Sequence, residues 1–192
     1  MKKMAGAFLL LLLIIGCADG KRKDRANRTP IVQMEDQTTD SLGVPRNTGW
    51  VTDMVYVLTD EEIAQLDSII GNYDKRTSVQ IAILTFDSLW TTEEDFDKFN
   101  TRVLNAWGIG QKESNNGILM GICPEYRKLR ITTGHGIEKV LNSSQINQII
   151  DNDILPYLKN DEYYNGILNG VLKIIQALDA KNDSTIYRKN AS

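Results

Sequence analysis

The stretch VQIAILTF, residues 79–86, decides the fold. Apolar side chains follow one another along it instead of alternating with polar ones, so both of its faces are expected to be buried. A strand buried on both faces lies inside a sheet that carries helices on its two sides. The stretch therefore predicts the central strand of an α/β domain.

The residues before this strand predict a shorter strand and a helix. The run VYVL, residues 55–58, predicts the strand. Thr59 and Glu62 then have the spacing of a capping box, in which each side chain satisfies a backbone N–H group of the other residue. One face of the helix that follows is apolar, at Ile63, Leu66, Ile70 and Tyr73.

The residues after the central strand continue the alternation. Thr91 and Glu94 repeat the capping-box spacing. The helix expected there has an apolar stripe at Phe96, Phe99, Val103 and Trp107. The runs GILMGIC (117–123) and LRITTG (129–134) flank a turn-like segment and predict an antiparallel hairpin.

Helices are expected after the hairpin. Ser143 or Ser144 is expected to cap the first, which is apolar at Ile146, Ile149 and Ile150, and Pro156 to bend or end its continuation. A last helix is expected over roughly 161–180, with an apolar face at Tyr164, Ile167, Leu168, Val171, Leu172 and Ile175. The expected fold class is α/β, a single-domain α/β/α sandwich with a small mixed sheet and one antiparallel hairpin.

The N-terminus has the pattern of an export signal. Lys2 and Lys3 precede an apolar run that is too short to span a membrane but long enough for a signal-peptide core. The run ends in IIGC, which resembles a bacterial lipobox. By that resemblance residues 1–16 are a lipoprotein signal peptide and Cys17 is the lipidated N-terminus. The alternative is an ordinary secretory signal with an incidental cysteine.

Composition divides the rest of the chain. Residues 17–48 lack apolar periodicity and predict a disordered tether, and the basic run KRKDRANR (21–28) near its start suits an anionic membrane surface or a solvated spacer. Residues 49–180 carry 11 Lys and Arg against 19 Asp and Glu, a net charge of −8. Such a domain repels phosphate backbones, so no nucleic-acid partner is expected. Residues 181–192 predict a polar tail.

Four stretches together resemble the TPM domain family, also called the TPM phosphatase family. They are VTDMVYVLTDEE, WGIGQKESNNGILM, YRKLRITTGHGIEKVL and ILPYLKNDEYYNGILNGV, in the family's order across residues 50–178. The resemblance implies a small α/β/α domain of a kind that is usually extracytoplasmic and often tethered to a membrane. Some relatives are credited with acid phosphatase activity, some bind divalent metal, calcium especially, and several act in the assembly or repair of membrane complexes.

The resemblance also supplies a candidate metal site. Asn115 stands where the family's loop has aspartate before Asn-Gly, and Asp53 and Glu138 match two further acidic positions. Asp87 follows the central strand and is expected near the same edge of the sheet. The four side chains offer the oxygen donors that calcium accepts, and calcium or another divalent metal is the cofactor implied. The alternative is that Asn115 only tolerates a left-handed backbone and the acids are solvated.

Catalytic motifs are few. His135 is the only histidine, so a two-histidine metal site is excluded. Its flanking glycines are expected to expose it at a loop tip, and a packing role, in the place of the family's aromatic residue, is favoured over catalysis. The chain has no phosphate-binding Gly-Lys-Ser/Thr loop and no Gly-x-Ser-x-Gly elbow, and no nucleotide or organic cofactor is expected. Cys123 lacks the arginine of a Cys-x5-Arg phosphatase signature, because Leu129 stands there.

Two hypotheses follow. The first is a lipid-anchored, extracytoplasmic accessory or interaction module of the bacterial cell envelope, with an envelope membrane-protein complex as its partner. The second is a divalent-metal-dependent acid phosphatase acting on phosphate monoesters, in which metal-bound water is the nucleophile.

Overall fold

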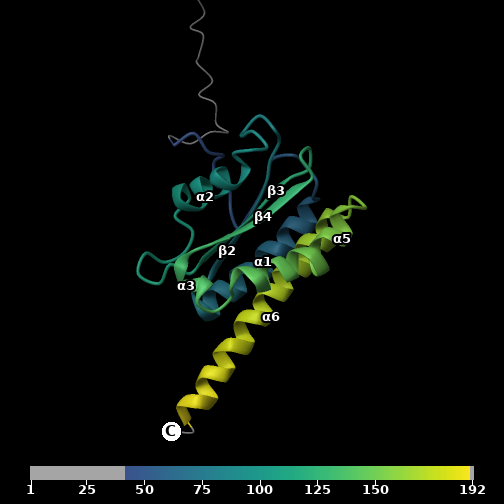
Figure 1. The fold of residues 1–192 in the computed structure, drawn as a ribbon. Helices are drawn as coiled ribbons and strands as arrows, with labels where there is room; N and C mark the ends of the chain where they lie inside the picture. Colours follow the sequence, from purple (N-terminus) through teal and green to yellow (C-terminus); the bar gives the residue numbers. More distant parts are fainter. Residues whose placement is uncertain (1–41, 191–192) are drawn as a thin grey trace, which may run out of the picture. The chain divides into compact units, whose positions relative to one another are not determined.

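The computed structural model describes the backbone of residues 42–190 and the side chains of residues 42–181. A four-stranded sheet lies at its centre (Figure 1). The strands stand in chain order: β1 (Val51–Asp53), β2 (Gln80–Thr85), β3 (Gly117–Cys123) and β4 (Lys128–Thr133). β1, β2 and β3 are parallel, and β4 runs antiparallel to β3. The mixed sheet and its hairpin are thus as the sequence predicts, with β2 in the interior.

Helices cover both faces of the sheet. Alternate residues of β2 point to opposite faces. Ile81 and Ile83 pack with α1 (Asp60–Thr77), α4 (Ser143–Ile149) and α6 (Tyr163–Asn190) in one apolar cluster. Ala82 and Leu84 pack with α2 (Phe96–Ala106) in a second cluster. The predicted α/β/α sandwich is confirmed.

The first predicted helix start is confirmed in detail. The Thr59 side chain accepts a hydrogen bond from the backbone N–H of Glu62 at 3.2 Å, and the Glu62 carboxylate accepts one from Thr59 at 2.8 Å. These bonds satisfy donors that have no partner inside the helix. Leu66, Ile70 and Tyr73 are buried on the predicted face of α1.

The strand predicted at 55–58 is wrong, because the strand in this part of the chain is β1, at Val51–Asp53. The Asp53 carboxylate accepts a hydrogen bond from the Leu58 backbone N–H at 2.8 Å, and this bond folds the intervening residues into a loop. Tyr56 adopts a left-handed backbone, with φ of 55°, and its side chain is 89% exposed. The prediction failed because the run VYVL has the apolar composition of a strand but lies in a tight loop.

Two predicted helix caps are also wrong. α2 begins only at Phe96, because Thr92 accepts a hydrogen bond from the Asp95 backbone N–H and holds the preceding residues in a turn. Its buried stripe still includes Phe96, as predicted. α4 is capped by Asn142, and not by Ser143 or Ser144, since Asn142 and Gln145 form a reciprocal pair of bonds at 3.0 and 3.3 Å.

The C-terminal helices differ from the prediction in two ways. A π-helical turn (Ile150–Ile154) joins α4 to the short α5 (Leu155–Leu158), and Pro156 lies in α5. α6 continues to Asn190, beyond the end expected at 180 and through most of the expected polar tail. Leu172, expected on its apolar face, is 45% exposed, whereas Ile174 is fully buried.

The last residues of the predicted tether belong to the domain. Val44 is fully buried in the α2 cluster, and the Trp107 indole N–H donates to the Pro45 carbonyl oxygen at 2.7 Å. The expected signal peptide (1–16), Cys17 and the rest of the tether up to residue 41 lie outside the described residues. None of the helices between residues 42 and 190 combines the length and the apolar character needed to cross a membrane.

Candidate functional site

The three parallel strands end at one edge of the sheet, here called the carboxyl edge. Their last residues are Asp53, Thr85 and Cys123, and β4 begins beside them at Lys128. Open α/β sheets bind ligands outside the carboxyl ends of their strands. This edge is therefore the first place to look for a site.

Both carboxylate oxygens of Asp53 accept hydrogen bonds from its own chain. One carboxylate oxygen accepts the backbone N–H of Leu58, and the other accepts the Thr85 hydroxyl. Thr85 is the residue opposite Asp53 in the β1–β2 register, and its side chain is buried. Asp53 thus joins two strands and shapes a loop, which is a structural role.

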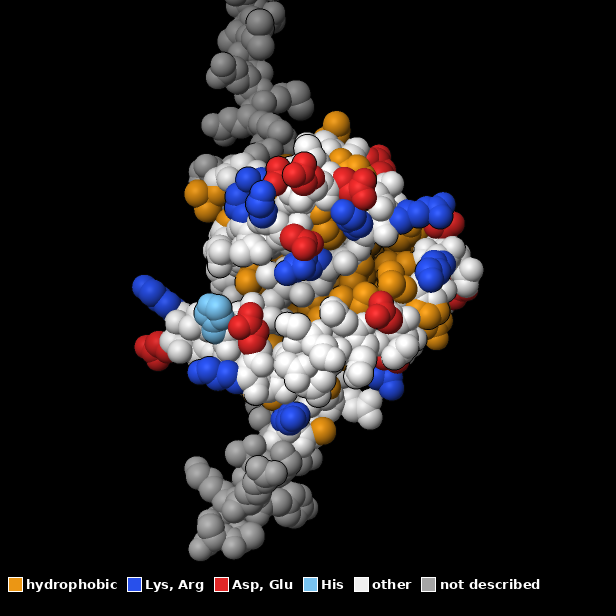
Figure 2. Space-filling model, viewed as in Figure 1, with side chains coloured by type: hydrophobic (Ala, Val, Ile, Leu, Met, Phe, Trp, Pro, Cys, Tyr) orange, Lys and Arg blue, Asp and Glu red, His pale blue; other side chains and the backbone are white. Residues whose placement is uncertain are grey.

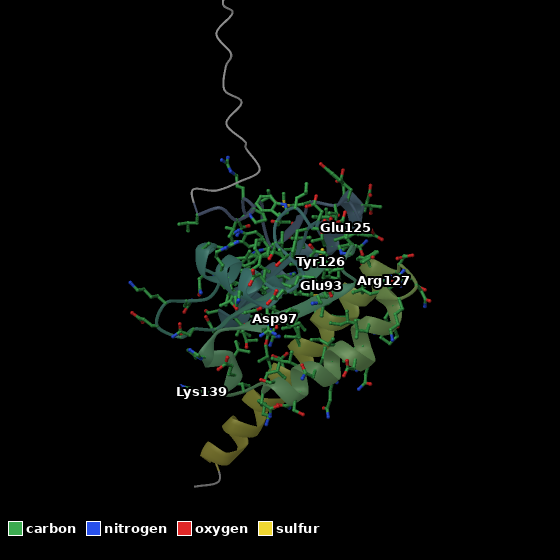
Figure 3. The ribbon with its side chains drawn as sticks, turned by 45° about the horizontal axis from the view of Figure 1, so that its top comes forward. Glu93, Asp97, Glu125, Tyr126, Arg127 and Lys139 are labelled. Atoms are coloured by element: carbon green, nitrogen blue, oxygen red, sulfur yellow. The ribbon has the colours of Figure 1, made fainter. Side chains whose placement is uncertain are left out.

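The other acids of this edge also bind backbone. Asp87 accepts the Leu89 backbone N–H at 3.0 Å, and Glu125 accepts the Ser88 backbone N–H at 2.9 Å. Hydrogen bonds from Ser88 hold the pKa of Glu125 below its ordinary value. Figure 3 shows Glu125 beside Tyr126, whose hydroxyl donates to the Thr91 carbonyl oxygen at 2.9 Å. The loops after β2 and β3 are therefore latched to each other.

The opposite edge, here called the amino edge, holds the other predicted ligands. Asn115 lies just before β3 with φ of 47°. His135 and Glu138 lie in α3 (His135–Glu138), just after β4, with 3.0 Å between His135 Nδ1 and the Glu138 carboxylate. Asn115, His135 and Glu138 line a cavity of about 680 Å³. The structure brings these three together.

Backbone packing explains the glycines of the amino edge. A Cβ on Gly117 would lie 2.1 Å from the Ile109 carbonyl oxygen, and one on Gly136 would lie 1.9 Å from that of Ser114. Asn116 completes the loop, since its side chain accepts from Gln111 N–H at 2.8 Å and donates to the Ser78 carbonyl oxygen at 2.6 Å. The loop 107–116 is thus held in place by its own polar contacts.

The four predicted metal ligands do not lie together. Asp53 and Asp87 follow strands at the carboxyl edge, whereas Asn115 and Glu138 lie at the amino edge. The six residues of β2 separate the edges by about 20 Å. The shared edge expected from sequence is wrong because β3 is parallel to β2, so the loop before β3 lies opposite the loop after β2. Within residues 42–181, no three His, Cys, Asp or Glu side chains form a group able to hold a metal ion.

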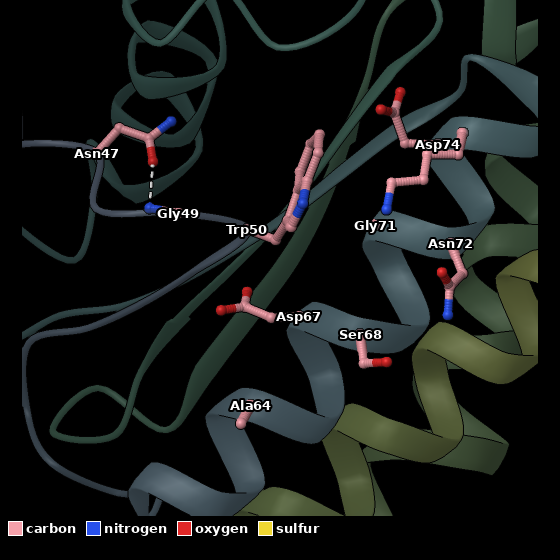
Figure 4. A pocket seen from close by; sticks show the side chains of 10 residues that line it. Asn47, Gly49, Trp50, Ala64, Asp67, Ser68, Gly71, Asn72 and Asp74 are labelled. Carbon is pink, nitrogen blue, oxygen red and sulfur yellow. Dashed lines mark hydrogen bonds between the residues drawn. The ribbon is translucent and has the colours of Figure 1, made fainter.

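A further groove lies between the segment before β1 and α1 (Figure 4). Asp67 accepts the Val51 backbone N–H at 3.1 Å, and burial raises the pKa of Asp67. The Trp50 ring lies against Gly71, where a Cβ would meet the indole nitrogen at 3.2 Å. These contacts fix β1 on α1, and Asp67 is one more acid with a structural role.

Comparison with known proteins identifies the family. A sequence model of the TPM domain matches residues 51–177, which is most of the chain. The chain belongs to the TPM domain family. Both edges of the sheet lie inside the matched TPM domain. No curated protein matches the chain at a significant level.

Solved structures share the fold of this TPM domain. The N-terminal domain of a P. gingivalis protein is 26% identical, with a TM-score of 0.62 over 78% of this chain and 87% of that one. The BA42 protein of the psychrophilic bacterium Bizionia argentinensis is 23% identical, with a TM-score of 0.57 over 67% of this chain and 86% of that one.

Sequence reasoning missed several residues of the carboxyl edge. Glu125 lies in the hairpin turn and was not recognised as the latch to Ser88. Arg127 lies in the same turn with a left-handed backbone, φ of 50°, which the sequence pattern does not indicate. The sequence signal that could have identified these residues is the succession of a glutamate, an aromatic residue and a basic residue between the two predicted strands.

Proposed function

We propose that this protein is a lipid-anchored, extracytoplasmic accessory module of the bacterial cell envelope, whose TPM domain binds a partner and does not catalyse a reaction. The observation that carries this proposal is the state of the carboxyl-edge acids. Both oxygens of Asp53 and one of Asp87 accept hydrogen bonds from the chain itself. These hydrogen bonds compete with a cation for the carboxylate lone pairs that a metal-dependent hydrolase would use to hold its ion.

The anchor rests on the N-terminal sequence. Cys17 directly follows Gly16 at the end of an apolar run. Stable anchoring needs two lipid signals, which a diacylated or triacylated cysteine supplies. The basic run at 21–28 adds attraction to anionic lipid, about 1 kcal/mol for each charge near the surface. The proposed partner is a membrane-protein complex of the envelope, which such an anchor brings within reach.

Calcium, or another divalent metal, is proposed to bind at the carboxyl edge or at the amino edge, and not at a site that joins the two. Asp87 offers oxygen donors at the carboxyl edge, and Asn115 and Glu138 offer them at the amino edge. Because each edge offers few charged ligands, the metal is expected to bind weakly. Acid phosphatase activity is the alternative function, and it depends on such a metal.

The anchor is tested by Cys17→Ala in the full precursor, with Cys123→Ala as the matched control. Cys17→Ala should leave the precursor uncleaved or move the protein to the soluble fraction. Cys123→Ala should be processed and fractionate as the wild type does, because Cys123 is buried in the domain. Mass spectrometry of the N-terminus and membrane fractionation give the answer. Unchanged mass and membrane binding of Cys17→Ala would contradict the anchor.

The choice between module and phosphatase is tested by hydrolysis of p-nitrophenyl phosphate, with and without Ca²⁺ or Mg²⁺. We expect no metal-dependent turnover. Turnover that rises with a divalent metal and is lost in Asp87→Asn would establish the phosphatase and overturn the accessory module. Lys139→Gln, at the other edge of the sheet, is the control for nonspecific effects of substitution.

A further inference from the structure

A hollow of about 400 Å³ lies between the end of β3, the β3–β4 turn and α5. Ligand pockets in proteins usually measure about 300–1,000 Å³. Figure 2 shows hydrophobic side chains exposed in a depression on this face, with charged side chains of both signs around it. The TPM resemblance assigned no role to this place.

The walls of the hollow are apolar. They are formed by Ile122, Cys123, Pro124, Leu155, Leu158 and Tyr163. α5 is held firmly, since a Cβ on Gly166 of α6 would lie 2.4 Å from Leu158 Cδ1. The hollow is thus bounded by packed elements.

The rim of the hollow is basic, although the domain is acidic. Arg127, Lys128 and Lys159 contribute to it, against one acid, Asp161. Lys128 is held by Glu93, 3.3 Å away. Asp161 is engaged by the Tyr163 hydroxyl.

Two cations of the rim are left for a ligand. Within the side chains that the structure describes, neither Arg127 nor Lys159 forms an ion pair with an acid. Both side chains are exposed at the mouth of the hollow. An anion above the apolar walls would therefore meet two positive charges without first breaking an ion pair.

We infer that this hollow binds a single-chain amphiphile with an anionic head group, namely a free alkyl carboxylate. The alkyl chain would occupy the apolar space, and the carboxylate would pair with Arg127 and Lys159. A small inorganic anion would leave the apolar walls unused. A cationic amphiphile would meet two like charges.

The probe is sodium decanoate, added below its micelle-forming concentration to the full chain in phosphatidylcholine nanodiscs. Leucine methyl groups are labelled for NMR, and the signals of Leu155 and Leu158 report on the hollow itself. Decanoate should shift both signals in a saturable manner. Octanoate should need about fifteen times the concentration, because each buried methylene strengthens binding about fourfold. Decylamine and decan-1-ol should bind at least tenfold more weakly than decanoate.

The head-group contact is tested by Arg127→Asn with Lys159→Gln, since asparagine tolerates the left-handed backbone of residue 127. Exposed ion pairs are individually weak, so the double variant should lose about tenfold in decanoate affinity and most of the preference over decylamine. Lys139→Gln is the matched control and should bind as the wild type does. No saturable shift, equal binding of decylamine, or an unchanged double variant that folds normally would each overturn the inference.

Discussion

The two edges of the sheet are built by different means. At the carboxyl edge, carboxylates hold the loops: Asp53 binds Leu58 N–H, and Glu125 binds Ser88 N–H. At the amino edge, backbone packs on backbone at Gly117 and Gly136, where no Cβ fits. Replacing a latch residue removes a hydrogen bond but adds no atoms, whereas a Cβ at either glycine would overlap the neighbouring backbone. We therefore expect the carboxyl edge to tolerate substitution and the amino edge to resist it.

The largest effect is expected from Gly117→Ala at the amino edge. The new Cβ would lie 2.1 Å from the Ile109 carbonyl oxygen, so strand or loop must shift. Overpacking of this kind costs about 3 kcal/mol of unfolding free energy. Gly108→Ala is the control, because φ is +62° there but nothing lies within 4 Å, and left-handed strain alone costs about 1 kcal/mol. Urea denaturation measures both, and equal losses would contradict the packing account.

Asp53→Ala at the carboxyl edge should cost about 2 kcal/mol, because the Leu58 N–H and the buried Thr85 hydroxyl lose their acceptor. Asp53→Asn keeps one acceptor oxygen and should recover part of the loss. Amide hydrogen exchange at Leu58 should accelerate in the alanine variant while the core of β2 stays protected. If exchange accelerated equally at Leu58 and in the core of β2, Asp53 would support the whole fold. The proposed difference between the two edges would then be wrong.

A smaller effect is expected at high pH from Tyr73, near the amino-edge end of α1. Burial, together with Asp179, raises the pKa of Tyr73 to about 12, above the unfolded value of 10. The unfolded state therefore loses its proton first, and stability falls as pH rises from 10 towards 12, by about 1 kcal/mol at pH 11. Tyr73→Phe should remove this part of the pH dependence. An unchanged slope between pH 10 and 12 would contradict it.

The smallest effect is expected from Asn115→Asp, which tests whether the edges are independent. Its new charge lies about 20 Å from Asp53 and Asp87, beyond strong coupling at ordinary salt. The effect of Asn115→Asp on the calcium-induced change in melting temperature should therefore be the same whether residue 53 is Asp or Asn. If the Asn115→Asp variant gains a calcium shift that Asp53→Asn abolishes, the edges share one site and the comparison fails.

Local sequence rules predicted much of the fold. The capping box of Thr59 and Glu62, the buried run of β2 and the β3–β4 hairpin follow from short-range patterns that tertiary contacts reinforce. The loop at 54–58 could not be predicted, because it depends on one carboxylate reaching a backbone N–H five residues away. The helix cap at Asn142 competed with two neighbouring serines of equal propensity.

The candidate site was predicted less well than the fold. Residue types identified Asp53, Asp87, Asn115 and Glu138 as oxygen donors, but chain direction decides which of them meet. β2 and β3 are parallel, and a hydrophobic pattern does not state the direction of a strand. The hydrogen-bonding state of Asp53 depends on Thr85, which is distant in sequence.

The contact between Trp107 and Pro45 sets where a mechanical load enters the domain. Val44 is buried beside α2, and the indole N–H of Trp107 donates a hydrogen bond to the Pro45 carbonyl oxygen. A pull on the proposed anchor would reach α2 first and β1 only after this clamp yields. At most about 95 Å of fully extended chain separates Cys17 from Val44. The clamp thus shields the short edge strand β1 from force applied through the proposed anchor.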